Sequence, residues 1–382
     1  MKVLHIINDL SLGGAQTQLL GLLHCWNSEP EMMSRVVCLL PQGDLETEFR
    51  RVTDVHHLGL RKSVGMLGQL PFGVVRLRRV VHAWTPDVIQ TWLHQSDLAG
   101  SVAGLALRST PVVWGLHHGT FNPAVDKWTT RTLVRTLGLS SSRLAAGAIA
   151  CGYEARSAHK SLGYRIPIVV VPNGVKMTSG GSVVEQDAAK RELGIEAGTP
   201  IVAVVARYHP MKGHDVALYA AALLKSWGHK FRWIMAGSGV DSTNASLVKL
   251  VNDLDLRDTI DLLGPRRDLD LIYGSSDLLC IPSVAAEGLP MVLLEAIAYG
   301  LGCVATDTGD CREILEPAWL TPVRNPTVLA HRIAAWLALN EEERNASIQR
   351  LQIILRAEYT IEASAKGYQS VYERLLANKT VT

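Results

Sequence analysis

The chain has 382 residues, of which 47% are hydrophobic and 19% charged, and its formal net charge is +2 at pH 7. This length predicts two domains, or three, and the composition is that of a soluble globular protein. No stretch approaches the ~20 apolar residues of a membrane span. Residues 1–9 turn polar too early for a signal peptide and are interpreted as a first strand. Six cysteines without a C-x-x-C pair indicate reduced core residues of a cytosolic protein.

The charge is unevenly distributed along the chain. Residues 1–175 contain 17 Lys and Arg against 11 Asp and Glu, whereas the remainder contains 21 against 25. A basic first half favours an acidic partner. Nucleic acid is not expected as that partner, because no interleaving of aromatic and basic residues accompanies the charge.

One basic stretch suggests a more specific partner. The uncharged run 63–75 is flanked by Arg61 and Lys62 on one side and by Arg76, Arg78 and Arg79 on the other. Apolar residues between basic clusters fit an anionic membrane surface. The alternative is an ordinary helix with a solvated basic face.

Short β-rich segments alternate with helical patterns along the whole chain, which predicts parallel sheets built from βαβ units. Strands are expected in the first half at residues 3–7, 35–40, 55–58, 88–91, 112–114, 148–151 and 168–171. Strands are expected in the second half at residues 201–205, 231–236, 260–263, 278–281 and 303–305. A Gly- and Ser-containing segment at 177–185 is interpreted as the linker between the halves. Two doubly wound domains follow, and such sheets bind ligands at the carboxyl ends of their strands.

The most informative segment is residues 283–300, where two glutamates interrupt an apolar run. Glu287 lies on the loop before a helix that begins near Pro290, and Glu295 lies in the second turn. An anion site is formed by the free backbone N–H groups of the segment Gly288, Leu289, Pro290, Met291 and Val292. Carboxylates accept hydrogen bonds from sugar hydroxyls, so the segment suits a sugar nucleotide. The alternative is a buried Glu paired with a basic residue and a loop Glu that caps the helix.

Glycine-bearing turns provide two further candidate phosphate sites. Gly13 and Gly14 follow the first strand and open a helix, although a plain turn explains them equally well. Arg207 and Lys212 stand between a strand and a helix, spaced to reach one diphosphate, and Gly237 closes the next strand. The alternative for the two cations is a solvated loop.

Two adjacent histidines, His117 and His118, follow a predicted strand, where either could donate to a sugar or phosphate oxygen or transfer a proton. A structural role is the alternative, and a metal site is not expected because no third ligand lies nearby. Asp-Leu-Asp occurs at 253–255 and 268–270. Both copies are interpreted as solvated faces and not as metal sites.

With these residues, the chain resembles the retaining GT-B glycosyltransferases of family 4. The specific part runs from about residue 202 to 315 and carries Arg207, Lys212-Gly213, Gly237 to Gly239, Glu287-Gly-Leu-Pro and Glu295 in the family's order. The first half matches more weakly, at Gly13-Gly14, the His pair and the residues 171–175.

The resemblance implies an α/β fold of two Rossmann-like doubly wound domains facing across a cleft. Residues 1–176 would bind the acceptor, residues 177–360 the nucleotide-sugar, and 361–382 would form a C-terminal helix that could return to the first domain. Arg207 and Lys212 would hold the diphosphate, Glu295 the ribose and Glu287 the donor sugar. His117 or His118 would lie over that sugar.

The implied reaction moves a hexose from a nucleoside-diphosphate sugar, with UDP favoured and GDP as the second choice, to a carbohydrate or lipid-linked acceptor in bacterial surface polysaccharide synthesis. No metal or other cofactor is expected, because two cations and helix dipoles serve the leaving group. Lys176 replaces the Asp that family members often carry there, which leaves the acceptor undefined. A sugar-nucleotide epimerase and a catalytically silent sugar-nucleotide-binding protein are the alternatives.

Overall fold

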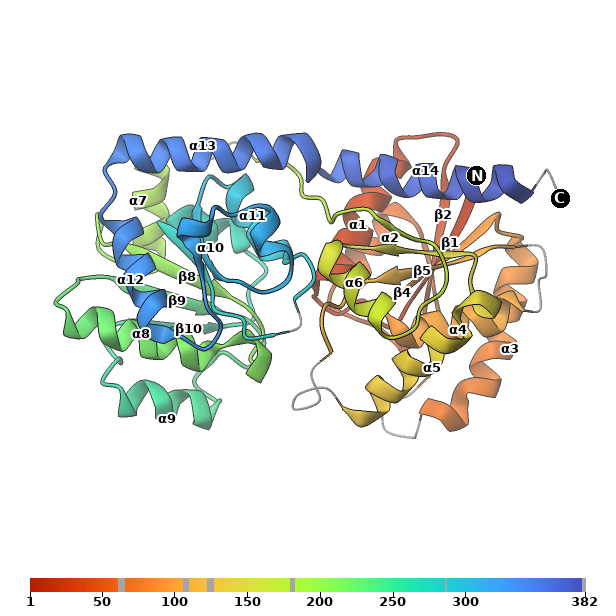
Figure 1. Ribbon diagram of the computed structural model, residues 1–382, viewed down its shortest axis with the longest axis horizontal. Helices are drawn as coiled ribbons and strands as arrows, with labels where there is room; N and C mark the ends of the chain where they lie inside the picture. Colours follow the sequence, from red (N-terminus) through yellow and green to blue (C-terminus); the bar gives the residue numbers. More distant parts are fainter. Residues whose placement is uncertain (61–65, 106–109, 122–126, 179–182, 286, 380–382) are drawn as a thin grey trace. The chain divides into compact units, whose positions relative to one another are not determined.

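The computed structural model describes residues 1–60, 66–105, 110–121, 127–178, 183–285 and 287–379. The chain forms two compact units (Figure 1). Unit 1 comprises Met1–Gly174 and Tyr359–Thr382, and unit 2 comprises Val175–Glu358. The end of the chain therefore belongs to the same unit as its beginning.

The described part of unit 1 contains a seven-stranded parallel sheet in the order β3-β2-β1-β4-β5-β6-β7. Its strands are β1 Lys2–Ile7, β2 Met33–Cys38, β3 Asp54–His57, β4 Val88–Trp92, β5 Val112–Leu116, β6 Gly147–Ala150 and β7 Ile168–Val170. The order reverses between β1 and β4, so the loops that follow these two strands meet at one point of the carboxyl edge.

Helices cover both faces of this sheet. They are α1 Gly14–Asn27, α2 Glu46–Val52, α3 Met66–Trp84, α4 His94–Gly104, α5 Trp128–Leu144, α6 Tyr153–Ser161 and α14 Ile361–Lys379. Alternate residues of β1 point to opposite faces: Leu4 and Ile6 join the core under α3, α4 and α5, whereas Val3 and Ile7 join the core under α1, α2 and α14. Figure 1 shows α14 beside α1 and the three helices α3, α4 and α5 together on the other side.

Unit 2 repeats this plan in a six-stranded parallel sheet with the order β10-β9-β8-β11-β12-β13. Its strands are β8 Ile201–Val205, β9 Arg232–Ala236, β10 Ile260–Gly264, β11 Leu278–Ile281, β12 Gly302–Thr306 and β13 Leu320–Thr321. The point of reversal lies between β8 and β11.

The helices of unit 2 also lie on both faces of its sheet. They are α7 Val183–Glu192, α8 His214–Ser226, α9 Ala245–Asp253, α10 Leu269–Ser275, α11 Met291–Ala298, α12 Pro326–Leu337 and α13 Glu341–Glu358. Three short 3₁₀ turns complete the unit: η1 Pro210–Lys212, η2 Gly309–Glu313 and η3 Pro317–Trp319. Helices α8, α9 and α12 share one core, and α10 and α11 contact strands β8, β11 and β12.

The predicted α/β fold class with two Rossmann-like doubly wound domains is confirmed, and every predicted strand is present. The predicted linker, residues 177–185, extends too far, because helix α7 begins at Val183. Five of the six cysteines are buried and all are free thiols. In the described ranges, no helix is long and apolar enough to cross a membrane.

Candidate functional site

The candidate site in unit 2 lies where the strand order reverses, on the loops that follow β8 and β11. The first loop carries Arg207 and η1, and the second carries Ser283 and Glu287. The amide of Val284 donates to the carbonyl of Met211 at 2.8 Å. Gly213, with φ of +65°, packs so closely that a Cβ atom there would lie 2.0 Å from the carbonyl oxygen of Pro282. Only glycine allows this contact between the loops.

Glu287 is held between the two loops and is only 8% exposed. Its Oε1 atom accepts from the Nζ of Lys212 at 2.5 Å and from the Oγ of Ser283 at 2.6 Å. Glu287, the loop acid, is thus buried and paired with Lys212, and it does not cap helix α11 as the alternative interpretation of the sequence had it. The basic residue is the other predicted ligand, so the positions of Lys212 and Glu287 are coupled.

A third loop, which follows β12, contacts the carbonyl group of Gly288, the residue after Glu287. Gly309, at φ of +57°, lies against residue 288, where a Cβ atom would come within 2.2 Å of the Gly288 carbonyl oxygen. The amide of Asp310 donates to that oxygen at 2.9 Å. Backbone contacts on both sides therefore fix the 287–288 segment before any ligand binds.

Arg207 is positioned by the turn after β9. Gly237, at φ of +152°, lies against Ala206, and the amide of Tyr208 donates to the carbonyl of Ser238 at 2.8 Å. The Arg207 side chain between them is exposed and makes no ion pair with any residue that the structure describes. It can therefore reach an anion without breaking a protein contact.

The segment predicted to form an anion site leads into the start of helix α11. Pro290 is its N-cap residue, and no side chain caps it. Met291 and Val292 open the helix, so their N–H groups have no acceptor within it. Leu289 and Met291 are buried, and Val292 is partly exposed. Together with Lys212 this end of the helix offers donors and positive potential suited to a phosphate.

Glu295 lies one turn further along α11 and is partly exposed. Its Oε2 atom accepts a hydrogen bond from the hydroxyl of Tyr273 at 2.8 Å. Burial raises the pKa of Glu295, and the hydrogen bond from Tyr273 partly opposes that shift. The sequence analysis did not find Tyr273, because a partner 22 residues away on another helix leaves no spacing signal.

His214, the first residue of α8, was also missed. It is 2% exposed, and burial lowers its pKa to about 4, with the nearby charge of Lys212 acting in the same direction and the carbonyl of Ala206 opposing it. Its ring lies 5.5 Å from that of Tyr208. A neutral imidazole therefore packs behind the loop that carries Arg207 and Lys212.

In unit 1 the predicted glycine turn lies at the same topological position. Gly13 is the extended N-cap residue of α1 and Gly14 is the first residue of that helix. A Cβ atom on Gly13 would lie 2.8 Å from the Oε1 of Gln16, whose Nε2 is 3.4 Å from the Oδ1 of Asp9. The turn is thus packed by its own polar side chains.

The two histidines differ in their surroundings. The ring of His117 stacks on that of Trp92 at 4.8 Å, and burial lowers its pKa to about 3. Neither ring nitrogen of His117 has a hydrogen-bond partner within the described part of the chain. His118 packs on Phe121 at 4.6 Å and edge-on to His94 at 6.3 Å. His117 is therefore neutral near pH 7.

A buried polar cluster that the sequence analysis missed lies next to this pair. Asp97 is fully buried and accepts from the hydroxyl of Thr91 at 2.5 Å, and its Oδ2 lies 3.7 Å from the Nδ1 of His94. Burial raises the pKa of Asp97 and lowers that of His159, which packs on His94 at 5.5 Å, to about 3. The only signal in the sequence was Asp97 itself, which is followed in its helix by small and apolar residues.

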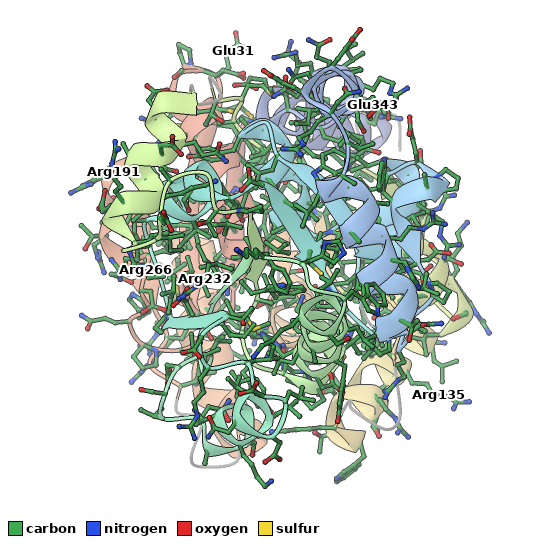
Figure 2. All side chains as sticks on the ribbon, turned by 90° about the vertical axis from the view of Figure 1, so that its left-hand side faces the viewer. Glu31, Arg135, Arg191, Arg232, Arg266 and Glu343 are labelled. Carbon is green, nitrogen blue, oxygen red and sulfur yellow. The ribbon has the colours of Figure 1, made fainter. Side chains whose placement is uncertain are left out.

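The structure thus groups the predicted residues within each unit. In unit 2, Arg207, Lys212, Glu287 and the start of α11 surround one reversal point. The aspartates of the Asp-Leu-Asp segments pair instead with local partners: Asp253 with Lys249, Asp255 with Lys225, Asp268 with Arg266 and Asp270 with Tyr299. Figure 2 shows Arg266 on the outer surface. Those pairings agree with the interpretation of both segments as surface features.

Two family models match this chain. The model described as Glycosyltransferase Family 4 matches residues 12–178, and the model described as Glycosyl transferases group 1 matches residues 185–351. The chain belongs to the family 4 glycosyltransferases. The predicted recognition of the family is therefore confirmed.

Related glycosyltransferases match this chain over different lengths. The glycosyltransferase named EpsF of Bacillus subtilis (strain 168) is 26% identical over 315 residues, which are 80% of this glycosyltransferase and 79% of EpsF. WcaL of Escherichia coli (strain K12), named for colanic acid biosynthesis, is 31% identical over 163 residues, 40% of either chain. These names indicate what the relatives do.

Solved structures match nearly the whole chain. HepE of Anabaena, solved with UDP and glucose, has a TM-score of 0.85 at 22% identity and covers 98% of this glycosyltransferase and 100% of HepE. Sucrose-phosphate synthase of Thermosynechococcus elongatus has a TM-score of 0.80 at 17% identity, with 99% and 100% covered. At these identities the likeness shows the fold alone.

Proposed function

We propose that this protein is a retaining hexosyltransferase that takes a hexose from a UDP-sugar and transfers it to a carbohydrate or lipid-linked acceptor in bacterial surface polysaccharide synthesis. The observation that carries the proposal is the pairing of Lys212 with Glu287 beside the start of α11. It places a cation for a diphosphate and a carboxylate for a sugar hydroxyl side by side. HepE, with UDP and glucose bound, and the relatives named for polysaccharide synthesis support this choice of donor and pathway.

The proposed residue roles follow from charge and position. Arg207 and Lys212 hold the diphosphate with Gly237 and the segment Gly288 to Val292, and Glu295 binds the ribose. Glu287 orients the hexose while its Lys212 partner moves toward phosphate. Gly13 and Gly14 line the acceptor side, and His117 or His118 contacts the hexose. The bond from the anomeric carbon to the phosphate oxygen breaks, the acceptor oxygen attacks from the same face, and the departing phosphate oxygen takes the acceptor's proton.

We propose that no metal takes part. The leaving diphosphate gains negative charge, which two cations and backbone N–H groups can stabilise where they are already oriented. Full turnover in excess EDTA, compared with turnover after added Mg²⁺ or Mn²⁺, tests this point. A strict dependence on added metal would contradict it.

A membrane is the proposed location of the acceptor, with the protein on the cytoplasmic side. Arg61 and Lys62 lie outside the described residues, but Arg78 and Arg79 are exposed on α3. The described helix α5 adds an exposed face with Trp128, Arg135, Leu139 and Arg143, and it contains no acidic residue. Figure 2 shows Arg135 pointing away from the protein. Arg side chains beside an exposed Trp and Leu fit an anionic lipid surface.

Two measurements test the proposed function. Thermal unfolding with UDP-, GDP- and ADP-sugars identifies the donor, because a ligand at 100 times its Kd stabilises by about 2.7 kcal/mol. Incubation with that donor then separates the alternatives. A transferase yields a glycoside only when acceptor is present, an epimerase changes the sugar without acceptor, and a silent binding protein changes nothing. Stabilisation by none of the nucleotide sugars would overturn the proposal.

A further inference from the structure

Helices α10 and α11 exchange two tyrosine–carboxylate hydrogen bonds. Tyr273 on α10 donates to Glu295 on α11 at 2.8 Å, and Tyr299, which ends α11, donates to Asp270 on α10. The two tyrosine rings lie 5.4 Å apart. The pairs have the same chemistry and opposite direction, so each serves as a reference for the other.

The two pairs differ in environment. Asp270 is exposed, so water can solvate its charge whatever Tyr299 does. Tyr273 is 1% exposed, and although Glu295 is partly exposed, burial raises the pKa of its carboxyl group. A carboxylate in such a place needs donors to stay ionised. Among the residues that the structure describes, Tyr273 is the only one that donates to Glu295.

The other titratable groups around this pair do not replace Tyr273. Tyr299 donates its hydrogen bond to Asp270 and not to Glu295. Cys303 on β12 is near enough to act on Tyr273, but its thiol is neutral because burial raises its pKa. Since Tyr273 holds Oε2, the Oε1 atom of Glu295 is left to accept from a ligand hydroxyl.

We propose that Tyr273 is the positioning residue of the ribose subsite: it fixes the Glu295 carboxylate and keeps it charged, so that Glu295 discriminates nucleotides by their ribose hydroxyls. This inference rests on the proposed function, in which Glu295 binds ribose. Ribose hydroxyls are donors, and a hydrogen bond to a charged acceptor contributes about 1.5–3 kcal/mol. Loss of the carboxylate charge therefore weakens selection for ribose and not the grip on the diphosphate.

The test compares Tyr273→Phe with its matched control Tyr299→Phe. Calorimetric Kd values are measured for UDP and for 2′,3′-dideoxy-UDP at pH 6.0 and 8.5. We expect the wild-type preference for UDP to fall about tenfold in Tyr273→Phe at pH 6.0, the scale of one such hydrogen bond, and to recover in part at pH 8.5. Tyr299→Phe should keep the wild-type preference at both pH values.

A ligand-free titration tests the same inference without relying on nucleotide binding. The carboxyl ¹³C signal of Glu295, assigned by its loss in Glu295→Gln, should titrate at higher pH in Tyr273→Phe and unchanged in Tyr299→Phe. An unchanged midpoint and an undiminished preference for UDP in Tyr273→Phe would overturn the role of Tyr273 while the donor site stands. Failure of the wild type to bind UDP, GDP or ADP would instead overturn the proposed function, and the ribose subsite with it.

Discussion

The two units carry the same strand order yet present different chemistry at their carboxyl edges. In unit 2, glycine contacts and backbone hydrogen bonds fix charged side chains, and Lys212 and Glu287 already form an ion pair. In unit 1, the corresponding edge carries the neutral imidazole of His117 and, on α4, the buried carboxyl group of Asp97. The topology thus decides where a site can lie, and loop residues decide what it can bind. Fixed charges suit a diphosphate, whereas neutral polar rings suit an uncharged sugar.

The largest expected effect comes from removing a cation, Lys212 or Arg207, from the candidate site in unit 2. Lys212→Ala should lower kcat and kcat/KM together by about 10²-fold, because the lost cation acts most on the leaving diphosphate. Arg207→Ala should have a similar effect. Lys225→Ala, which removes an exposed ion pair with Asp255 in the same unit, is the control and should leave turnover unchanged. Near-normal kcat in Lys212→Ala would remove the leaving-group site from unit 2.

Substitution of Glu287 and of Glu295 in unit 2 should change different kinetic parameters. Glu287→Ala should reduce kcat, because the sugar it contacts changes charge in the transition state. Glu295→Ala should mainly raise the donor KM, by about tenfold or more, because ribose contacts change little during bond cleavage. Steady-state kinetics with varied donor measure both. The reverse assignment, with Glu295 controlling kcat, would mean that the donor binds in the opposite direction.

Lowering the pH should destabilise unit 1 more than unit 2. Folding lowers the pKa of His5, His117 and His159 in unit 1 to about 3, against 6.5 in the unfolded chain. The native state therefore binds fewer protons, and its stability falls as pH drops from 6.5 toward 3, by about 1.4 kcal/mol per pH unit for each histidine. Asp97, with a raised pKa, acts in the opposite direction but is a single group.

In unit 2 the pKa shifts of two buried groups act in opposite directions, since the pKa of His214 is lowered and that of Glu295 is raised. Hydrogen exchange followed by mass spectrometry between pH 7 and 4 should show unit 1 losing protection first. His159→Phe should flatten that pH dependence, because Phe fits among the rings of Phe121 and Tyr164. Earlier loss of protection in unit 2 would contradict this assignment.

The smallest expected effect concerns the basic helices of unit 1. Each Arg near an anionic bilayer contributes about 1 kcal/mol, and salt should weaken the interaction. Co-sedimentation with anionic but not neutral vesicles is expected, and Ser at Arg78, Arg79, Arg135 and Arg143 should abolish it. A control with Ser at the unit 2 residues Arg332, Arg350 and Arg356 should bind normally. Equal sedimentation with both vesicle types would show that the basic face is only solvated.

Much of the fold follows from local pattern. The strands of both sheets are short runs of β-branched and apolar residues, so their alternation with helical segments predicts two doubly wound domains. The bounds of helices α2, α5 and α6 do not follow from the sequence, because α5 has a polar and basic face with few apolar positions and the other two are short. The site on unit 2 was largely predictable, because Arg207, Lys212, Glu287 and Glu295 lie in two short segments with turn and helix-start signals.

Other features depended on the tertiary structure. The sequence by itself determined which residues can form strands, which loops can approach a phosphate and which acids interrupt an apolar helix, because these depend on neighbours within a few positions. Only the folded chain decided that Glu287 pairs with Lys212, that Tyr273 holds Glu295 and that the ring of His94 packs on those of His118 and His159. These contacts join residues from different loops and helices, and their partners are set by sheet order and packing, which no local pattern encodes.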